Sequence, residues 1–293
     1  MSTEGYAEFL VQMGHQVRRN AGVWWFDVHR HIYMSFPFDQ PVDPGHVDRG
    51  LVLGRDGWAA RFPTAPGLGK PSYRIACRDH GYDLQSLRSK TRNQTRRGLE
   101  NCTCRFLGWD ELETQGIALN IGTLRRQGRV VGPDVETYWK RYFAAAAKAE
   151  GAEAWGAFHD GALAAYLIAF VMENTSHVLI VRSDPEKLRF YPNNALLFTY
   201  LSESLVRRGL QEVSIGLESI QSGMEGLDRF KQGMGFVKVP IGQRVILKPA
   251  ARLLTLSPIS GLATGLARRL SGAEKADKLS GLLEWYKQQP RLT

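Results

Sequence analysis

The sequence predicts a mixed α/β protein of two halves, the first of them degenerate, followed by a basic helical tail. With 293 residues, 43% of them hydrophobic, the chain is long enough for two compact cores. Two stretches repeat a strand–helix–strand order, and the residues from Lys248 onward mix apolar and basic residues in a helical rhythm. We therefore expect an N-terminal half over 1–130, a C-terminal half over 131–247 and a tail over 248–293.

The first half alternates between helical and extended patterns. Apolar residues at helical spacing near the N-terminus predict a helix, and the aromatic and β-branched residues that follow predict strands. The expected elements, in chain order, are a helix over 6–19, strands within 23–37, strand candidates at 50–54 and 59–62, a strand over 72–78, a helix over 86–99, a strand over 102–107 and a helix over 110–126.

The second half begins with a helix over 134–149 and continues with three antiparallel strands. The first two strands, 154–159 and 162–173, are joined by Asp160-Gly161, a residue pair that favours a type I′ turn. After the third strand, a long helix begins at Pro192 and ends at Arg208, with Gly209 in the C′ position. The remaining expected elements are a third strand over 176–183, a strand over 213–216, a helix over 223–233 and a strand over 236–247.

This order of elements resembles that of the acyl-CoA N-acyltransferase (GNAT) fold, and the resemblance implies that the third strand and the following helix would hold the donor's phosphates. Ordinary CoA-dependent members carry small residues in that loop, because backbone N–H groups must close on the pyrophosphate. Here the loop reads Glu-Lys-Leu-Arg-Phe-Tyr-Pro-Asn-Asn over 186–194 and contains no glycine. The sequence therefore favours a donor held in another way, although Lys187 and Arg189 can still attract an anionic group.

A short motif near the end of the second half carries a more specific resemblance. The segment Asp228-Arg-Phe-Lys-Gln-Gly-Met-Gly-Phe236 is similar to the Phe-Lys-x-Gly-Phe-Gly signature of Fem-type transferases. The match places Phe230 and Lys231 on the Phe-Lys pair, and Met234 departs from the usual aromatic residue. The glycine and aromatic positions of the signature fall on Gly233, Gly235 and Phe236.

The resemblance covers 154–245 and implies a chain of two GNAT-like halves that moves an amino acid from aminoacyl-tRNA onto an amine. It also implies a catalytic role for Lys231 beside Phe230, because an ammonium next to the ester carbonyl stabilises the negative charge that develops there. A solvated lysine at a helix end is the alternative for Lys231.

Other polar residues fall where a GNAT site opens. Glu218, just beyond the strand end at Gly216, is a candidate general base for the attacking amine. Asn193 and Asn194 can hydrogen-bond a peptide-like substrate or only cap the helix start. Structural ion pairs are the alternative for the charged candidates. The candidate substrate-binding residues are His177, Arg182, Asp184, Tyr191, Asn193 and Asn194.

The charge favours a polyanionic partner. The net charge is +9 and the pI is near 9.6. Arg88, Lys90, Arg92, Arg96 and Arg97 form a basic stretch without an acid, which predicts contact with tRNA phosphates or, alternatively, a solvated face. The tail carries eight basic residues against three acids, which fits docking on the core, an RNA contact or a peripheral membrane contact.

Several classes of protein do not fit the sequence. The first twenty residues lack a secretory signal, and the longest apolar run, 162–172, is shorter than the ~20 residues of a membrane-spanning helix, so we expect a cytoplasmic protein. Cys77, Cys102 and Cys104 show no zinc spacing and are expected to be reduced thiols. We expect neither a metal nor another cofactor. There is no nucleophile elbow, Walker loop or dinucleotide fingerprint.

The sequence thus predicts an aminoacyltransferase that forms an amide bond between an amino acid from aminoacyl-tRNA and the amine of a peptide, small molecule or cell-wall precursor. Cell-wall members of the Fem type often carry a coiled-coil arm, and no heptad arm is visible here, which favours a small peptide or natural product as acceptor. The first alternative is a GNAT N-acyltransferase that uses acyl-CoA or acyl carrier protein. The second is a non-catalytic RNA- or membrane-binding protein.

Overall fold

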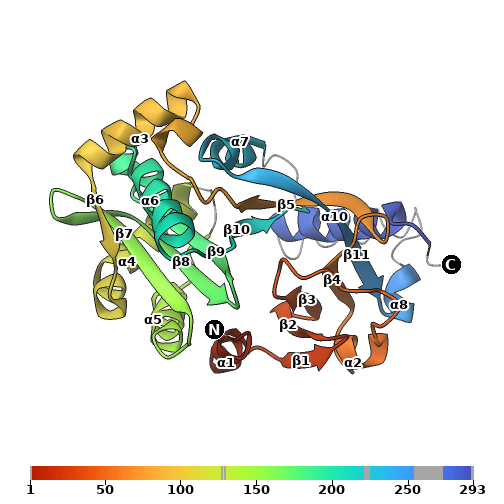
Figure 1. Cartoon of the computed structure of the whole chain (residues 1–293). Helices are drawn as coiled ribbons and strands as arrows, with labels where there is room; N and C mark the ends of the chain where they lie inside the picture. Colours follow the sequence, from red (N-terminus) through yellow and green to blue (C-terminus); the bar gives the residue numbers. More distant parts are fainter. Residues whose placement is uncertain (1, 127, 129, 221–224, 254–272, 292–293) are drawn as a thin grey trace. The chain divides into compact units, whose positions relative to one another are not determined.

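The computed structural model describes residues 2–126, 128, 130–220, 225–253 and 273–291. They form two compact units, each assembled from three segments of chain. The first unit consists of Met1–Met13, Ile75–Gly216 and Arg229–Val237, and the second of Gly14–Arg74, Leu217–Asp228 and Lys238–Thr293. The predicted boundary at residue 130 lies inside the first unit, and the division into 1–130, 131–247 and 248–293 stays a prediction. Figure 1 follows the chain by colour.

The first unit is built on a mixed sheet. Its strands lie in the order β10-β9-β8-β7-β6, with β7 to β9 as an antiparallel meander and β10 parallel to β9. Asp160 and Gly161 both have positive φ, 51° and 75°, which confirms the predicted hairpin turn. The strands are β6 (Thr103–Phe106), β7 (Ala152–His159), β8 (Ala162–Met172), β9 (Thr175–Ser183) and β10 (Glu212–Leu217).

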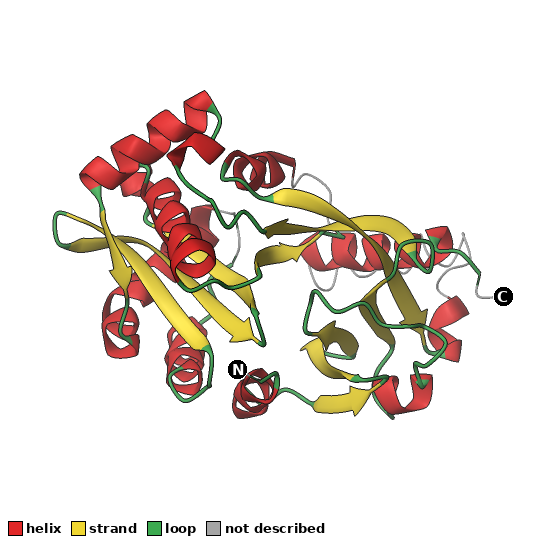
Figure 2. Ribbon diagram, in the orientation of Figure 1, coloured by secondary structure: helices red, strands yellow, loops and turns green. Residues whose placement is uncertain are grey.

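Helices cover both faces of this sheet (Figure 2). Trp155 of β7 meets Tyr200 of α6 on one face, with ring centroids 5.8 Å apart. Tyr166 of β8, opposite the next residue of β7, points to the other face, where its hydroxyl donates to Asn120 of α4 at 2.6 Å. Because both faces are covered, β8 is buried from Leu163 to Met172. The helices are α6 (Pro192–Leu201) with α3 (Ser89–Asn101) packed on it, and α1 (Glu4–Gln12), α4 (Trp109–Arg126) and α5 (Val135–Ala146) on the second face.

The long helix of the second predicted half is confirmed, with two irregular ends. A 3-10 helix, η2 (Pro185–Phe190), precedes α6, and Tyr191 between them has a left-handed φ of 56°. After α6, Ser202–Arg207 forms a π-helical segment, and Gly209 follows with a φ of 67° as the predicted C′ glycine.

Two predicted elements are wrong for local reasons. The helix expected over 6–19 ends at Gln12, because Gly14 takes a left-handed φ of 86°, and Val17–Asn20 then forms β1. The strand expected at 50–54 is the short helix α2 (Arg49–Leu53). Its start is stabilised by Asp48, whose carboxylate accepts from the N–H groups of Gly50 and Leu51 at 2.8 and 3.0 Å.

The second unit contains the strand order β1-β2-β3-β4-β11, in which β3 and β4 are parallel and the other pairs antiparallel. Trp25, Tyr33 and Phe62 form the centre of its larger core. Three strands, β5, β10 and β11, and the helix α7 have residues in both units. The elements not yet bounded are β2 (Val23–His29), β3 (Ile32–Phe36), β4 (Ala59–Thr64), β5 (Lys70–Cys77), α7 (Glu225–Gly233), β11 (Val237–Leu247), α8 (Pro249–Arg252) and α10 (Ala273–Gln288).

The described part of the tail packs on its own unit. Leu282, Leu283 and Trp285 of α10 are buried against Val245 and Leu247 of β11. Beyond the helix, the Gln289 side chain accepts from the N–H of Val245 at 2.8 Å and donates to its carbonyl at 2.9 Å. Docking on the core, one of the three roles open to the tail, is therefore observed for 279–289, while 254–272 lie outside the described residues. None of the helices in the described ranges has the length and hydropathy to cross a membrane.

Gly98 sets the distance between α3 and α6, and its replacement by alanine should destabilise the protein. A Cβ at this position would lie 2.6 Å from the carbonyl oxygen of Tyr191. We expect Gly98→Ala to lower the free energy of unfolding by about 1–3 kcal/mol, because overpacking displaces the backbone. Gly226→Ala in α7 is the matched control, since its Cβ would meet no atom of the described residues within 4 Å, and the variant should be about 0.5–1 kcal/mol more stable. Urea unfolding measures both, and equal stability of the two variants would contradict this account.

Candidate active site

The glycines of the Fem-like motif permit close packing around the end of α7. Gly235 has a φ of 93°, and a Cβ there would lie 2.7 Å from the ring of Tyr82. The Tyr82 hydroxyl donates to the carbonyl of Met234 at 2.7 Å. A Cβ on Gly233 would lie 2.9 Å from Oγ1 of Thr91 in α3. The two glycines therefore let α7 end against α3 and Tyr82, which explains their place in the motif.

Lys231 is held in a defined position by this packing. Its half-buried Nζ donates to the carbonyl of Ile215 in β10 at 3.2 Å. The parallel pairing of β10 with β9 ends one residue earlier, at Ser214 and His177, although both strands continue. The ammonium thus lies where two parallel strands part, a position where α/β sheets commonly bind ligands. Phe230 is half-buried beside it, and its proposed catalytic role stays a prediction.

The start of α6 brings two of the predicted binding residues to the same neighbourhood. Asn194 is buried and its Nδ2 lies 3.5 Å from the sulfur of Met234 in the motif. Asn193 donates through Nδ2 to Oγ of Ser183 at 3.2 Å. Its buried Oδ1 has no hydrogen-bond partner among the residues that the structure describes. Asn194 thus links α6 to the motif, and Asn193 has an acceptor atom available for a donor group.

The loop before α6 is closed by its own hydrogen bonds. The Asp184 carboxylate accepts from the N–H of Glu186 at 3.0 Å, and the N–H of Lys187 donates to the Asp184 carbonyl at 3.2 Å. The N–H of Tyr191 donates to Leu188 at 3.1 Å. At the helix start Pro192 has no N–H, and the N–H of Asn194 donates to Tyr191 at 3.1 Å. Most amides that could surround a pyrophosphate at this corner are therefore already used.

Two predicted binding residues lie on the opposite face of the sheet. His177 and Arg182 stand opposite Phe170 and Tyr166 in the β8–β9 register, on the face covered by α1, α4 and α5. His177 is only 2% exposed. Arg182 donates through Nε to Oδ1 of Asn120 at 3.2 Å and lies 5.8 Å from the ring of Trp139. The structure therefore does not gather the six predicted binding residues in one cluster, and their roles stay predictions.

The basic residues predicted to contact tRNA lie on the outer side of α3. Arg88 is the N-cap, and Lys90, Arg96 and Arg97 are exposed, whereas the half-buried Arg92 donates to the side chain of Gln85. The inner side of α3 packs through Gly98 against the start of α6 and through Thr91 against the end of α7. The guanidinium of Arg97 lies 5.5 Å from the ring of Tyr191. The positive surface of α3 thus borders the residues around Lys231 and α6.

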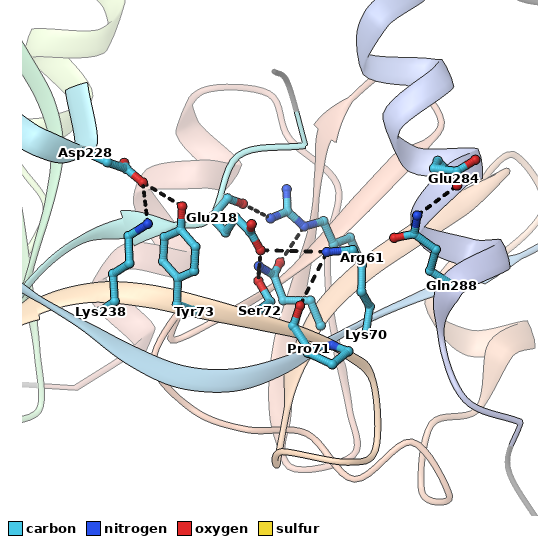
Figure 3. A network of polar contacts seen from close by, with 11 residues as sticks. Arg61, Lys70, Pro71, Ser72, Tyr73, Glu218, Asp228, Lys238, Glu284 and Gln288 are labelled. Atoms are coloured by element: carbon cyan, nitrogen blue, oxygen red, sulfur yellow. Dashed lines mark hydrogen bonds and ion pairs between the residues drawn. The ribbon is translucent and has the colours of Figure 1, made fainter. Parts of the chain in front are cut away.

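Glu218 belongs to the second unit and to a separate polar network (Figure 3). Its Oε2 accepts from Oγ of Ser72 at 2.6 Å and lies 4.0 Å from Nζ of Lys70. Gln243 donates to the same serine at 2.7 Å and accepts from Nε of Arg61 at 2.6 Å. Glu218 therefore takes part in an ion pair and a hydrogen bond, which agrees with the alternative of a structural ion pair given for the charged candidates. Its role as general base stays a prediction.

Sequence reasoning missed Tyr82, Asn120 and Arg61, because no motif marks them and their partners are distant in the chain. The three cysteines are free thiols, and burial raises the pKa of Cys104 to about 11. Within the described part of the chain, no group of three or more His, Cys, Asp or Glu residues could hold a metal ion.

Residues 85–232, just over half of the chain, match the acetyltransferase (GNAT) domain family, so this protein belongs to the GNAT family of acyltransferases. Its fold is similar to that of FemX, with a TM-score of 0.59 over 86% of this chain and 92% of that one at 13% identity. The C-terminal domain of a putative lysylphosphatidylglycerol synthetase from Agrobacterium fabrum is similar over 92% of this chain and 93% of its own, at 13% identity and a TM-score of 0.57.

L-PGS from Bacillus licheniformis matches 88% of this chain and 95% of its own, at 13% identity and a TM-score of 0.50. At such identities the likeness concerns the fold. No curated protein sequence matches the chain. The predicted mixed α/β class with GNAT-like construction and the resemblance to Fem-type proteins are confirmed.

Proposed function

We propose that this acyltransferase transfers an aminoacyl group from aminoacyl-tRNA to an amine and forms an amide bond. The observation that carries the proposal is the closed loop between β9 and α6. Most of its amides are bonded internally, the N–H of Tyr191 among them, and Pro192 has no N–H at a corner where a CoA-binding loop needs free N–H groups. A donor whose phosphates are bound elsewhere on the surface fits this geometry better than CoA.

The basic surface of α3 supports a nucleic-acid donor. Arg88, Lys90, Arg96 and Arg97 are exposed, and α3 contacts both the Lys231 helix and the start of α6. Arg side chains bind phosphates through bidentate hydrogen bonds. A tRNA whose backbone lies on α3 would bring its acylated end toward Lys231.

Attack of an amine on the tRNA ester requires a positive group that stabilises the developing oxyanion, and the proposed step uses no cofactor. The amine nitrogen attacks the ester carbonyl, the carbonyl oxygen becomes negative, and Lys231 stabilises that charge. The C–O ester bond then breaks, the ribose hydroxyl of the tRNA takes a proton, and the amine, having lost one, becomes an amide. The free Oδ1 of Asn193 is suited to accept a hydrogen bond from the attacking amine.

The acceptor that we propose is a peptide, a small molecule or a cell-wall precursor in the cytoplasm, and peripheral membrane contact remains part of the proposal. The name lysylphosphatidylglycerol synthetase, carried by a protein of similar fold, describes the attachment of a lysyl group and agrees with aminoacyl transfer. The acetyltransferase description of the family favours the second candidate, an N-acyltransferase that uses acyl-CoA or acyl carrier protein.

A comparison of donors tests the choice. Purified protein is incubated with mixed aminoacyl-tRNAs and candidate amines, and in parallel with acetyl-CoA and the same amines. We expect amine-dependent loss of the tRNA ester with formation of an amide, and no rise of Tm with CoA. A ligand at 100 times its Kd stabilises a protein by about 2.7 kcal/mol, so CoA binding would be visible as a shift of several degrees. Consumption of acetyl-CoA together with such a shift would establish the second candidate instead.

A further inference from the structure

The second unit contains a pocket that the proposed function does not use. Its volume is about 220 Å³, and strands β2 and β3, the start of β4, the segment after β10 and the helix α10 contribute to its wall. The walls include the aliphatic side chains of Ile32, Met34, Ile220 and Leu282. Ligand pockets of about 300–1,000 Å³ accept drug-sized molecules, so this one suits a ligand of amino-acid size.

Arg61 lines this pocket, and its guanidinium is held in a fixed position. Its Nε donates to Gln243 at 2.6 Å, its Nη2 donates to the carbonyl of Glu218 at 2.5 Å, and its guanidinium lies 4.7 Å from the ring of Trp285. Nη1 has no hydrogen-bond partner among the described residues, and Figure 3 shows this nitrogen outside the dashed network. Burial lowers the pKa of Arg61 to about 10, which still leaves the group charged at neutral pH.

The lining is one-sided in charge. Arg61 and Lys278 line the pocket, and no aspartate or glutamate does so among the described residues; the carboxylate of Glu218, whose charge raises the pKa of Arg61, lies outside the lining. A cation with apolar neighbours loses hydration, and an anion that donates no proton but accepts hydrogen bonds compensates for that loss. The shape and the charge of the lining together favour a ligand with one anionic end and an apolar body.

We propose that this pocket binds a small carboxylate with an aliphatic body, and that Arg61 holds the carboxylate. The planar guanidinium matches a carboxylate and still has donors available. The aliphatic wall accepts the body of the ligand. The proposal does not depend on aminoacyl transfer, because all of these residues belong to the second unit and the Lys231 motif is not among them.

The test uses sodium 4-methylpentanoate as probe and 4-methylpentanamide as its neutral isostere, at constant ionic strength adjusted with NaCl. Isothermal titration and Tm are measured on the full chain. We expect saturable binding and a raised Tm with the carboxylate, and neither with the amide. Arg61→Gln should weaken binding at least about tenfold, because a charge-assisted hydrogen bond is lost. Arg30→Gln, an exposed arginine of the same unit, should bind like the wild type.

A second variant keeps the test decisive if Arg61→Gln does not fold. Met34→Trp fills the pocket and leaves every partner of Arg61 in place, so it should abolish binding while the circular dichroism spectrum is retained. Equal binding of the acid and the amide, unchanged binding in Arg61→Gln or Met34→Trp, or no binding by the wild type would each overturn the proposal. None of these readouts requires transferase activity.

Discussion

Replacement of Lys231 by alanine is expected to lower kcat about a hundred- to a thousandfold, because one fixed donor to a developing oxyanion contributes about 2.7–4 kcal/mol. The structure gives this expectation a geometric basis. The ammonium is held at 3.2 Å from the Ile215 carbonyl, where β9 and β10 part, so little reorganisation is needed as charge develops. KM should change little, since the interaction is made chiefly in the transition state.

Two further variants separate catalysis from structure. Lys231→Arg should restore only part of the rate, because the planar guanidinium cannot place its charge at the same point. Lys140→Ala, at an exposed lysine of α5 in the same unit, should leave kcat unchanged. Retention of more than about half of the wild-type kcat in Lys231→Ala, with donor and acceptor established, would remove this residue from the mechanism.

Reversal of charge on α3 should produce the second large effect. In Arg88→Glu/Arg96→Glu/Arg97→Glu, we expect the Kd for tRNA at about 50 mM salt to rise at least a hundredfold, because phosphate contacts turn into repulsions. Each contact contributes about −0.7 to −0.9 to the slope of log affinity against log salt, so the loss of three should flatten that slope by about 2–3. Filter binding over a salt series measures both quantities.

The matched control reverses the same number of charges elsewhere in the first unit. Arg125, Arg126 and Arg141 are exposed at the end of α4 and on α5, and their replacement by glutamate gives the same net charge. A protein that binds tRNA only through its overall charge would lose affinity equally in both triple variants. Such a result would leave α3 as a solvated face.

Patterns of neighbouring residues predicted most of the helices and strands. The exceptions depend on backbone angles, helix caps and contacts that these patterns do not contain. The hairpin at Asp160-Gly161 and the helix from Pro192 follow from neighbouring residues alone, so the sequence sufficed for them. Gly14 ends the first helix early through its left-handed backbone angle, although the apolar pattern continues. Asp48 starts a helix by capping it where the apolar pattern indicated a strand. The spacing of apolar residues contains neither signal. The sequence showed that the loop before α6 contains no glycine. It did not show that this loop forms a 3-10 helix, in which backbone N–H groups donate hydrogen bonds within the loop.

The candidate site shows the same division. The motif around Lys231 could be recognised in the sequence because its residues are adjacent in the chain. The structure shows why two of its positions are glycines, since a Cβ at either would clash with a neighbouring side chain. The opposite faces taken by Arg182 and Asn193 depend on strand register and on which helices cover the sheet. The pocket of Arg61 joins residues from β4, the segment after β10 and α10, which no spacing in the sequence connects.

The path of the chain between the units limits how this protein can be divided. The chain passes from one unit to the other five times, after Met13, Arg74, Gly216, Asp228 and Val237. No continuous stretch of the gene therefore encodes one unit alone, and a cut anywhere between Gly14 and Val237 leaves neither fragment with a complete unit. A fragment that ends in that range would have an incomplete core, so the two units have to be synthesised as parts of one chain.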